Sequence, residues 1–205
     1  LKALQSQINP HFLYNTLDMI NWMSQKKESE NIRSVVQAMS RFYRLTLSKG
    51  RDIVSIRDEV EMCEAYMEIQ KRRYRGRICY EVEVDGDILD CLIPKITLQP
   101  FLENAIIHGI NEKADGRGMV ILNGWMEDGR ITLSVTDDGE GMTQEDKKKS
   151  HQGSHYGLSN IEHRLELFFG ESIPVQVESS PGIGTCVIIN IPIRTEAEEA
   201  VEHEK

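Results

Sequence analysis

Val135-Thr136-Asp137-Asp138-Gly139-Glu140-Gly141-Met142 is a stretch in which a carboxylate and two glycines follow the end of an apolar segment. The preceding residues, Ile131–Val135, alternate between β-branched and polar types, which predicts a strand that presents Asp137 at the rim of a sheet. Gly139 and Gly141 would let the backbone approach a ligand closely. Taken alone, the stretch fits an acidic turn, a fragment of a calcium loop or part of a nucleotide pocket.

Calcium is the least supported of these three interpretations. An EF-hand loop needs oxygen ligands at alternating positions, a central glycine and a glutamate at the twelfth position. The residues that follow Asp137 do not provide that array. The choice between a turn and a nucleotide pocket therefore depends on the rest of the chain.

The composition restricts the partners and the setting. A formal charge of −9 over 205 residues argues against nucleic acid as a partner, because phosphate backbones attract clustered Lys and Arg. The four cysteines form no Cys-x-x-Cys pair, so we expect neither a zinc site nor a disulfide framework, and a reducing cytoplasmic setting fits. The chain starts with Leu1 inside a helical pattern, which predicts a cytoplasmic piece of a membrane protein whose N-terminal sensor region is missing.

Residues 1–75 have a helical pattern. Apolar residues recur at helical spacing on both sides of the polar turn 26–31, which predicts two helices in a hairpin. A third helix is expected to begin at Ser55, with Asp58 and Glu59 in its first turn. The hairpin has a wide apolar face, and we expect a homodimer whose hairpins form a four-helix bundle; the alternative is that the third helix or the second domain covers this face.

Residues 76–195 mix strand and helix signals, which predicts an α+β fold with a sandwich of sheet and helices. Residues 196–205 are an acidic, solvated tail. The expected strands span 78–84, 119–126, 131–135, 175–178 and 186–191, and the expected helices span 96–108 and 158–169.

Three further segments carry polar or glycine residues in suggestive places. Asn104 and His108 lie four residues apart in the helix 96–108, where Asn104 is either a magnesium ligand or a hydrogen-bonded core amide. The loop from Gly153 through Gly157 runs directly into a helix, where exposed amides suit phosphates. The segment 180–185, Ser-Pro-Gly-Ile-Gly-Thr, would alone be an ordinary hairpin turn.

In this order and spacing, the four segments resemble the nucleotide-binding elements of the ATPase superfamily shared by histidine kinases, gyrase, Hsp90 and MutL, called the Bergerat fold. The resemblance implies that ATP and Mg²⁺ are bound, with Asn104 on the metal and Asp137 accepting a hydrogen bond from the adenine amino group. A carboxylate suits adenine because it accepts from the exocyclic amine and repels the carbonyl edge of guanine. The other implied contacts are Gly139 and Gly141 at the base, Thr185 supporting the base, His108 at a phosphate, and Gly153, Gly157 and Leu158 in or beside a lid over the phosphates.

The lid departs from many relatives, because His155 stands where they have glycine. His151 and His155 lie four residues apart, but Gly153 lies between them and no helix is indicated there, so zinc is not expected. Hydrolytic relatives place a glutamate one turn before the metal-binding asparagine to activate water, and that position here is Pro100. Glu103 remains a possible base, and the phosphoryl group is expected to go to an acceptor other than water.

That acceptor is suggested by Gln7-Ile-Asn-Pro-His-Phe-Leu-Tyr-Asn15. Pro10 bends or restarts the helix just before His11, whose imidazole keeps a lone pair that can attack phosphorus near pH 7. Together with Tyr66–Arg73 and Leu98–Ala105, this segment resembles the LytS/YesM class of sensor histidine kinases. The resemblance implies autophosphorylation of His11, transfer to an aspartate of a response-regulator receiver domain, and a role for Asn15 in orienting the imidazole or a water.

Two other functions remain open on the sequence. An ATP-driven clamp or hydrolase would need a water-activating group, and a non-catalytic dimerisation module would not need the intact nucleotide motifs. In many histidine kinases an acidic residue follows the histidine, whereas here Phe12 follows it, so the base is open apart from Glu103.

Overall fold

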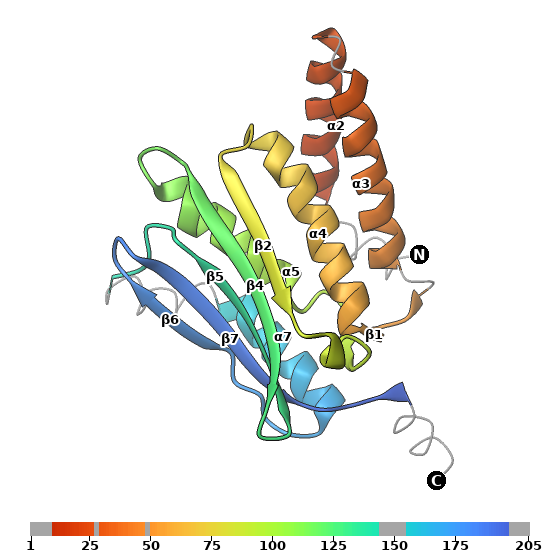
Figure 1. Ribbon diagram of the computed structural model, residues 1–205, viewed down its shortest axis with the longest axis vertical. Coiled ribbons are helices and arrows are strands. Elements are labelled where there is room, and N and C mark those ends of the chain that lie inside the picture. The colour runs from red at the N-terminus through yellow and green to blue at the C-terminus, as the bar shows by residue number, and fades with distance from the viewer. Residues whose placement is uncertain (1–9, 27–28, 48–49, 144–154, 197–205) are drawn as a thin grey trace.

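The computed structural model describes residues 10–26, 29–47, 50–143 and 155–196, and it shows a helix-covered sheet beside a helical hairpin (Figure 1). This confirms the predicted α+β class. No helix in these four stretches is long and apolar enough to cross a lipid bilayer.

The hairpin consists of α2 (Pro10–Gln25) and α3 (Ser29–Leu47). Its inner side buries apolar residues from both helices, namely Phe12, Met23, Val35, Ala38 and Phe42.

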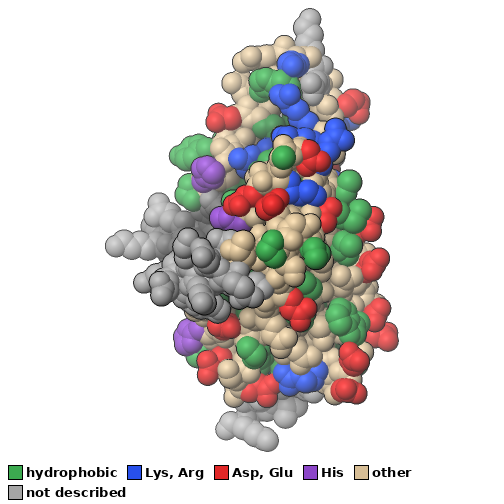
Figure 2. Space-filling model, turned by 90° about the vertical axis from the view of Figure 1, so that its left-hand side faces the viewer, with side chains coloured by type: hydrophobic (Ala, Val, Ile, Leu, Met, Phe, Trp, Pro, Cys, Tyr) green, Lys and Arg blue, Asp and Glu red, His purple; other side chains and the backbone are tan. Residues whose placement is uncertain are grey.

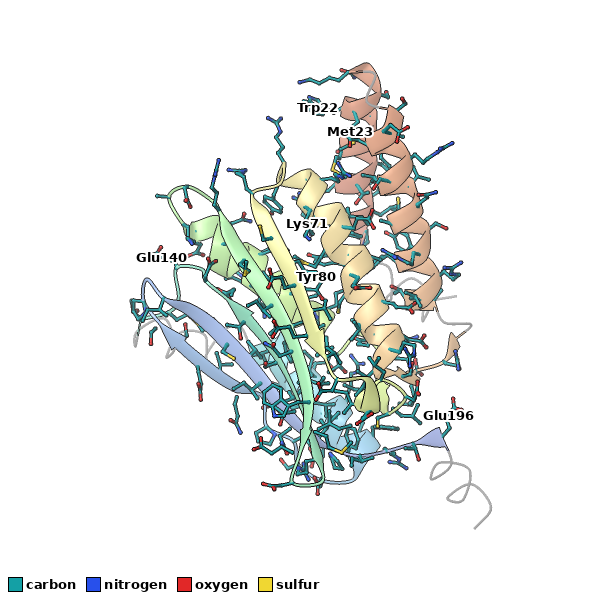
Figure 3. All side chains as sticks on the ribbon, in the orientation of Figure 1. Trp22, Met23, Lys71, Tyr80, Glu140 and Glu196 are labelled. Atoms are coloured by element: carbon teal, nitrogen blue, oxygen red, sulfur yellow. The ribbon has the colours of Figure 1, made fainter. Side chains whose placement is uncertain are left out.

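Helix α4 (Ile56–Arg73) lies between the hairpin and the sheet (Figure 1). Ser55 caps it as predicted, because the serine hydroxyl accepts the N–H of Asp58 at 3.1 Å. Toward α3, Glu68 accepts hydrogen bonds from Ser34 (2.7 Å) and Arg41 (3.0 Å). Toward the sheet, Lys71 lies beside Tyr80, with its ammonium 5.9 Å from the ring centroid (Figure 3). Because α4 packs on both sides, the boundary placed at residue 75 stays a prediction.

The main sheet has the strand order β2-β4-β5-β7-β6. Strands β2 and β4 are parallel, and the other neighbours are antiparallel. The Asp128-Gly129 turn between β4 and β5 has positive φ at both residues (51° and 73°), as a two-residue hairpin turn requires. The strands are β2 (Ile78–Val84), β4 (Gly118–Glu127), β5 (Arg130–Asp137), β6 (Gln176–Ser180) and β7 (Gly184–Pro192).

One face of this sheet packs against α4, α5 and α7 and forms the core. The alternation along β2, where Ile78 is buried and Cys79 and Glu81 are exposed, shows that the opposite face meets solvent. The helices on the inner face include α5 (Gln99–Asn104) and α7 (His155–Phe169), and α7 ends before Gly170 with a φ of 73°.

The helix predicted over 96–108 is divided in the structure. It begins at Gln99, because Ile96 has a φ of 58° and cannot continue a helix, and Pro100 occupies the first turn. After Asn104 the chain forms a π-helical turn, Ala105–Gly109, and then a 3₁₀ turn, Ile110–Glu112. Sequence patterning also missed the 3₁₀ turn Gly86–Ile88 and the small antiparallel sheet of β1 (Ile53–Ser55) and β3 (Leu92–Pro94), which are too short to show a period.

Candidate functional site

The carboxylate of Asp137 lies at the end of β5 on the helix-covered face, and the residue is only 6% exposed. Oδ1 accepts a hydrogen bond from the backbone N–H of Gly139 at 2.8 Å. Burial raises the pKa of Asp137 to about 6, although the N–H groups of Gly139 and Thr185 favour its charged form. A desolvated acceptor of this kind is suited to a neutral donor on a ligand.

Two glycines press against this carboxyl group. A Cβ on Gly109, the last residue of the π-helical turn, would lie 2.5 Å from Oδ1 of Asp137, and one on Gly139 would meet both Oδ1 and the backbone of Gly109. Contacts within the chain therefore require glycine at position 139, whereas its expected close approach to a ligand stays a prediction, and Gly109 is an additional residue at the site that the sequence pattern did not indicate. The signal was a glycine at the end of a helix whose side carries Asn104 and His108.

The turn between β6 and β7 closes one side of the site. Gly182 donates its N–H to the carbonyl of Glu140 at 2.6 Å, and Figure 3 shows Glu140 at this end of the sheet. Gly141 (φ 69°) passes so close to the carbonyl of Ser180 that a side chain would collide with it. Gly184 (φ 132°) is packed in the same way against the carbonyl of Asp137. Thr185 stands directly opposite Asp137 in the β5–β7 register.

Asn104 and His108 are both exposed, at the end of α5 and in the π-helical turn. His108 Nδ1 lies 3.8 Å from a carboxylate oxygen of Glu112. A π-helical turn inside a helix is often found at functional sites, because it changes which side chains share a face. The exposed amide of Asn104 is a suitable single ligand for Mg²⁺, which keeps most of its waters. Within the stretches that the structure describes, no group of three or more His, Cys, Asp or Glu could hold a metal.

Glu103 faces α4 and is half-buried. It accepts a hydrogen bond from the side chain of Gln99 at 2.8 Å, and burial raises its pKa. A carboxyl group with a raised pKa is a better proton acceptor at neutral pH than an ordinary one. Glu103 lies close enough to Tyr66 of α4 to raise the pKa of that phenol.

The predicted lid is described only in part. Gly153 and His151 lie outside the described residues, and the side chain of His155 is not described. Gly157 falls in the first turn of α7, and Leu158 is half-buried against the core. Arg164, two turns further along α7, donates hydrogen bonds to the carbonyls of Lys95 and Ile96 at the start of α5.

His11 is exposed on the second residue of α2. The amide nitrogen of Asn15 lies 3.2 Å from both ring nitrogens of His11. One atom cannot align with two in-plane nitrogen positions, so the amide lies against the ring and leaves the in-plane lone pair accessible. Phe12, the next residue, packs on Phe42 (5.1 Å between ring centroids) and Tyr66 (5.2 Å), which places α2 against α4.

Lys113 and Asp138 form an ion pair at the site that the sequence pattern did not indicate. Lys113 donates to the backbone carbonyl of Asp138 at 2.9 Å, and its ammonium lies 3.7 Å from the Asp138 carboxylate. Asp138 in turn accepts the N–H of Met119 at 2.8 Å. These contacts join the segment after the π-helical turn to the loop that carries Gly139. Nothing in the local sequence pattern indicates a pair separated by 25 residues.

Two family models match this chain. The model described as "Histidine kinase" matches residues 1–78, and the one described as "Histidine kinase-, DNA gyrase B-, and HSP90-like ATPase" matches residues 93–195. The first match contains His11 and the second contains Asn104, Asp137 and Thr185.

Individual proteins agree with these matches. Sensor histidine kinase YesM of Bacillus subtilis is 37% identical over 196 residues, which cover 96% of this chain and 34% of YesM. This chain therefore spans about a third of the length of that relative. The histidine kinase domain of the blue-light-activated kinase EL346 from Erythrobacter litoralis has a TM-score of 0.54 at 20% identity, over 100% of this chain and 94% of that one. The kinase ThkA, in a complex with the response regulator TrrA, has a TM-score of 0.50 at 14% identity, over 93% and 61% of the two chains.

Proposed function

The chain belongs to the histidine kinase family of two-component sensors, and on that premise we propose that it binds magnesium-ATP beside Asp137 and transfers the γ-phosphoryl group to His11. In the proposed complex, Asp137 accepts a hydrogen bond from the adenine amine, Gly139 and Gly141 allow the base to approach, and Thr185 supports it. The observation that carries the proposal is the buried carboxylate, held by two backbone N–H groups and enclosed by glycines. Guanine is excluded because its carbonyl would face this carboxylate.

Asn104 would hold Mg²⁺ through its amide oxygen, and His108 would contact a phosphate. Magnesium neutralises phosphate charge when it is bound. Both side chains are exposed on the segment that ends at Gly109 beside Asp137, so a nucleotide whose base lies at Asp137 would extend its phosphates along α5. Gly153, Gly157 and Leu158 would belong to the segment that covers the phosphates.

The acceptor in the proposal is a ring nitrogen of His11. Its lone pair forms the N–P bond while the bond between the γ-phosphorus and the bridging oxygen breaks, and ADP leaves with that oxygen. The other ring nitrogen then loses its proton to solvent or to a base, for which Glu103 is the candidate. Asn15 would hold the ring orientation, because its amide lies against the imidazole.

The partners follow from the same proposal. A homodimer formed through α2 and α3 would supply the phosphotransfer bundle, and an aspartate on a receiver domain would take the phosphoryl group from His11. ThkA, which shares this fold, is seen with a response regulator. We place the chain on the cytoplasmic side of a membrane, as part of a longer sensor protein, because ATP and receiver domains are found there.

Incubation with γ-labelled ATP tests the transfer. We expect an acid-labile, alkali-stable phosphoprotein that is absent in His11→Ala. His163→Ala is the matched control, since His163 is another exposed histidine on a helix, and it should label normally. Labelling that persists in His11→Ala would contradict the assignment of the acceptor, and steady phosphate release without a phosphoprotein would favour a hydrolase instead.

Magnesium binding is tested separately by Asn104→Ala. Asn104 is exposed, so the substitution removes no core contact and the variant should fold. We expect this variant to lose magnesium-dependent ATP affinity by about tenfold or more. Affinity for ATP in the presence of EDTA should change much less. Unchanged magnesium-ATP affinity in the folded variant would rule out this role for Asn104.

A further inference from the structure

Three polar side chains form a row across the sheet at the site. In the β6–β7 register Ser179 stands opposite Thr185, and in the β5–β7 register Thr185 stands opposite Asp137. Directly paired residues on neighbouring strands point to the same face of a sheet. Asp137 is on the helix-covered face, so all three side chains lie on that face. Ser179 has no role in the function proposed above.

Three groups of the described residues lie close to the hydroxyl of Ser179. The N–H of Met142 points to its oxygen at 2.9 Å, the carbonyl of Gly184 lies at 3.1 Å, and the hydroxyl of Thr185 lies at 2.9 Å. Met142 belongs to the loop after Gly141. Ser179 therefore connects that loop, the β6–β7 turn and Thr185 through a single oxygen.

The chemistry of a hydroxyl determines the direction of these hydrogen bonds. A serine hydroxyl has one proton to donate and two lone pairs to accept. The carbonyl of Gly184 can only accept and the N–H of Met142 can only donate. All three contacts are satisfied together only if Ser179 donates to Gly184 and accepts from Met142 and from Thr185. Gly184 is buried, so a carbonyl left unpaired there would be unfavourable.

This arrangement has a consequence for Thr185. Its proton is directed at Ser179, so its remaining lone pairs are the part of the hydroxyl that a ligand beside Asp137 would meet. The carboxylate of Asp137 also offers lone pairs. The base edge at this position thus faces two acceptors on neighbouring strands.

We propose that Ser179 is a positioning residue of the nucleotide site: it fixes the Thr185 hydroxyl as a second acceptor and thereby strengthens selection for a purine with an amine at position 6. An exocyclic amine has two N–H groups, whereas a carbonyl at the same position has none. The selectivity rests on the proposed function, because it presupposes that a purine nucleotide binds beside Asp137. Ser179 acts through Thr185 and does not touch the base.

The test compares ATP with inosine triphosphate, which carries a carbonyl in place of the amine. Dissociation constants of both magnesium complexes are measured by calorimetry for the wild type and Ser179→Ala. We expect ATP affinity to fall by about three- to tenfold in the variant, which corresponds to the loss of one or two hydrogen bonds. Affinity for inosine triphosphate should stay the same or rise, because a released Thr185 hydroxyl can donate to the carbonyl.

Two further variants keep the result interpretable. Ser179→Thr retains the hydroxyl and should restore the preference for ATP. Thr136→Val removes a hydroxyl from the opposite face of β5, where it contacts Cys186 at 3.2 Å, and should leave the preference unchanged.

If Ser179→Ala does not fold, Thr185→Val tests the second acceptor directly and should lower the ratio of ATP to inosine triphosphate affinity. Unchanged affinities for both nucleotides in folded Ser179→Ala would overturn the role of Ser179. An equal loss of both nucleotides would overturn the assigned direction of the Thr185 hydroxyl. A wild-type protein that binds neither nucleotide would refute the proposed function instead, so the two failures are distinguishable.

Discussion

The fold holds a single carboxylate, Asp137, in an unfavourable environment at the proposed nucleotide site. The carboxyl group is almost fully buried, so its charged form is destabilised relative to water. Two backbone N–H groups and the nearby Lys113 offset part of this penalty, while Asp138 adds to it. In the proposed complex, a ligand that offers a donor to this carboxylate recovers the remaining part, so the residue would act in recognition as well as in structure.

The ionisation of Asp137 predicts how nucleotide binding depends on pH. Burial raises its pKa to about 6, from an ordinary value of 3.8. Adenine needs the ionised carboxylate as an acceptor, so the dissociation constant of magnesium-ATP should increase as the pH falls through 6, by at most about tenfold per unit. Calorimetric titrations between pH 5 and about 8 measure this. Asp137→Asn should bind ATP more weakly and should lack this inflection; the same inflection in the variant would assign it to another group.

The same pKa shift acts on stability in the opposite direction. Because the folded protein raises the pKa of Asp137, it binds this proton more tightly than the unfolded chain does. The contribution of Asp137 to the free energy of unfolding is therefore greatest below pH 3.8 and is lost as the pH rises through about 6. Stability is reduced at the pH where nucleotide recognition requires the charged form.

Sequence patterns identified the residues whose chemistry is visible locally. Asp137 follows an alternating strand, and its predicted place at the rim of a sheet is confirmed by the end of β5. Gly109 and Ser179 were missed, because their importance depends on contacts with residues 28 and six positions away that form only when the sheet is assembled. A glycine or a serine has too many structural uses for its type alone to indicate such a contact.

At the scale of elements, the segment just before α5 is held by two helices. Glu59 of α4 is 1% exposed and accepts the N–H groups of Ile96, Thr97 and Leu98 at 2.7–2.9 Å. Arg164 of α7 binds the carbonyls on the other side of the same segment. Burial raises the pKa of Glu59, while the three N–H groups favour its charged form. The helix that carries Asn104 is thus positioned by the helices before and after it in the chain.

Glu59→Gln should reveal this positioning. The variant keeps the shape of the side chain but places an NH₂ group against the N–H of Ile96, so one buried donor loses its acceptor. We expect the free energy of unfolding in urea to fall by about 1–3 kcal/mol and ATP affinity to fall as well. Glu61→Gln, at an exposed position of the same helix, is the control and should change neither quantity. Equal stability of the two variants would show that Glu59 does not hold this segment.

The elements themselves were predictable where they are long and periodic. The strand 78–84 and the Ser55 cap of the third helix are confirmed, whereas the helix predicted over 96–108 begins three residues later, at Gln99, and is divided after Asn104. Its apolar spacing gave no indication that Glu59, 37 residues upstream of Ile96, would bind the backbone there in a non-helical conformation. The parallel pairing of β2 with β4 was likewise invisible, because strand direction depends on the crossover between them.

At the scale of the whole molecule, charge and apolar surface are unevenly distributed. In Figure 2 the Lys and Arg side chains gather in the upper part of the displayed face, and the Asp and Glu side chains predominate below. The end of α2 contacts the turn after α4 through a cation–π interaction, in which the guanidinium of Arg75 lies 5.0 Å from the ring centroid of Trp22. Tyr14 and Leu17 on α2, and Val36 on α3, remain exposed at 66%, 48% and 49%.

Exposed apolar residues on both helices of the hairpin predict that a second copy covers them. Helix α4 already packs against the hairpin and leaves these side chains uncovered, so the alternative considered from the sequence, in which the same chain covers this face, accounts for only part of it.

Leu17→Glu would bury an unpaired carboxylate in the dimer, and we expect the dimer dissociation constant to rise by about a hundredfold. Sedimentation equilibrium measures the mass of the particle in solution. Calorimetry should show unchanged ATP affinity, because Leu17 lies on α2 of the hairpin whereas Asp137 lies at the end of β5. Leu167→Glu is the control, since Leu167 is 71% exposed on α7, and it should remain dimeric. A wild-type protein that sediments as a monomer, or a Leu17→Glu variant as dimeric as the control, would rule out this face as the interface.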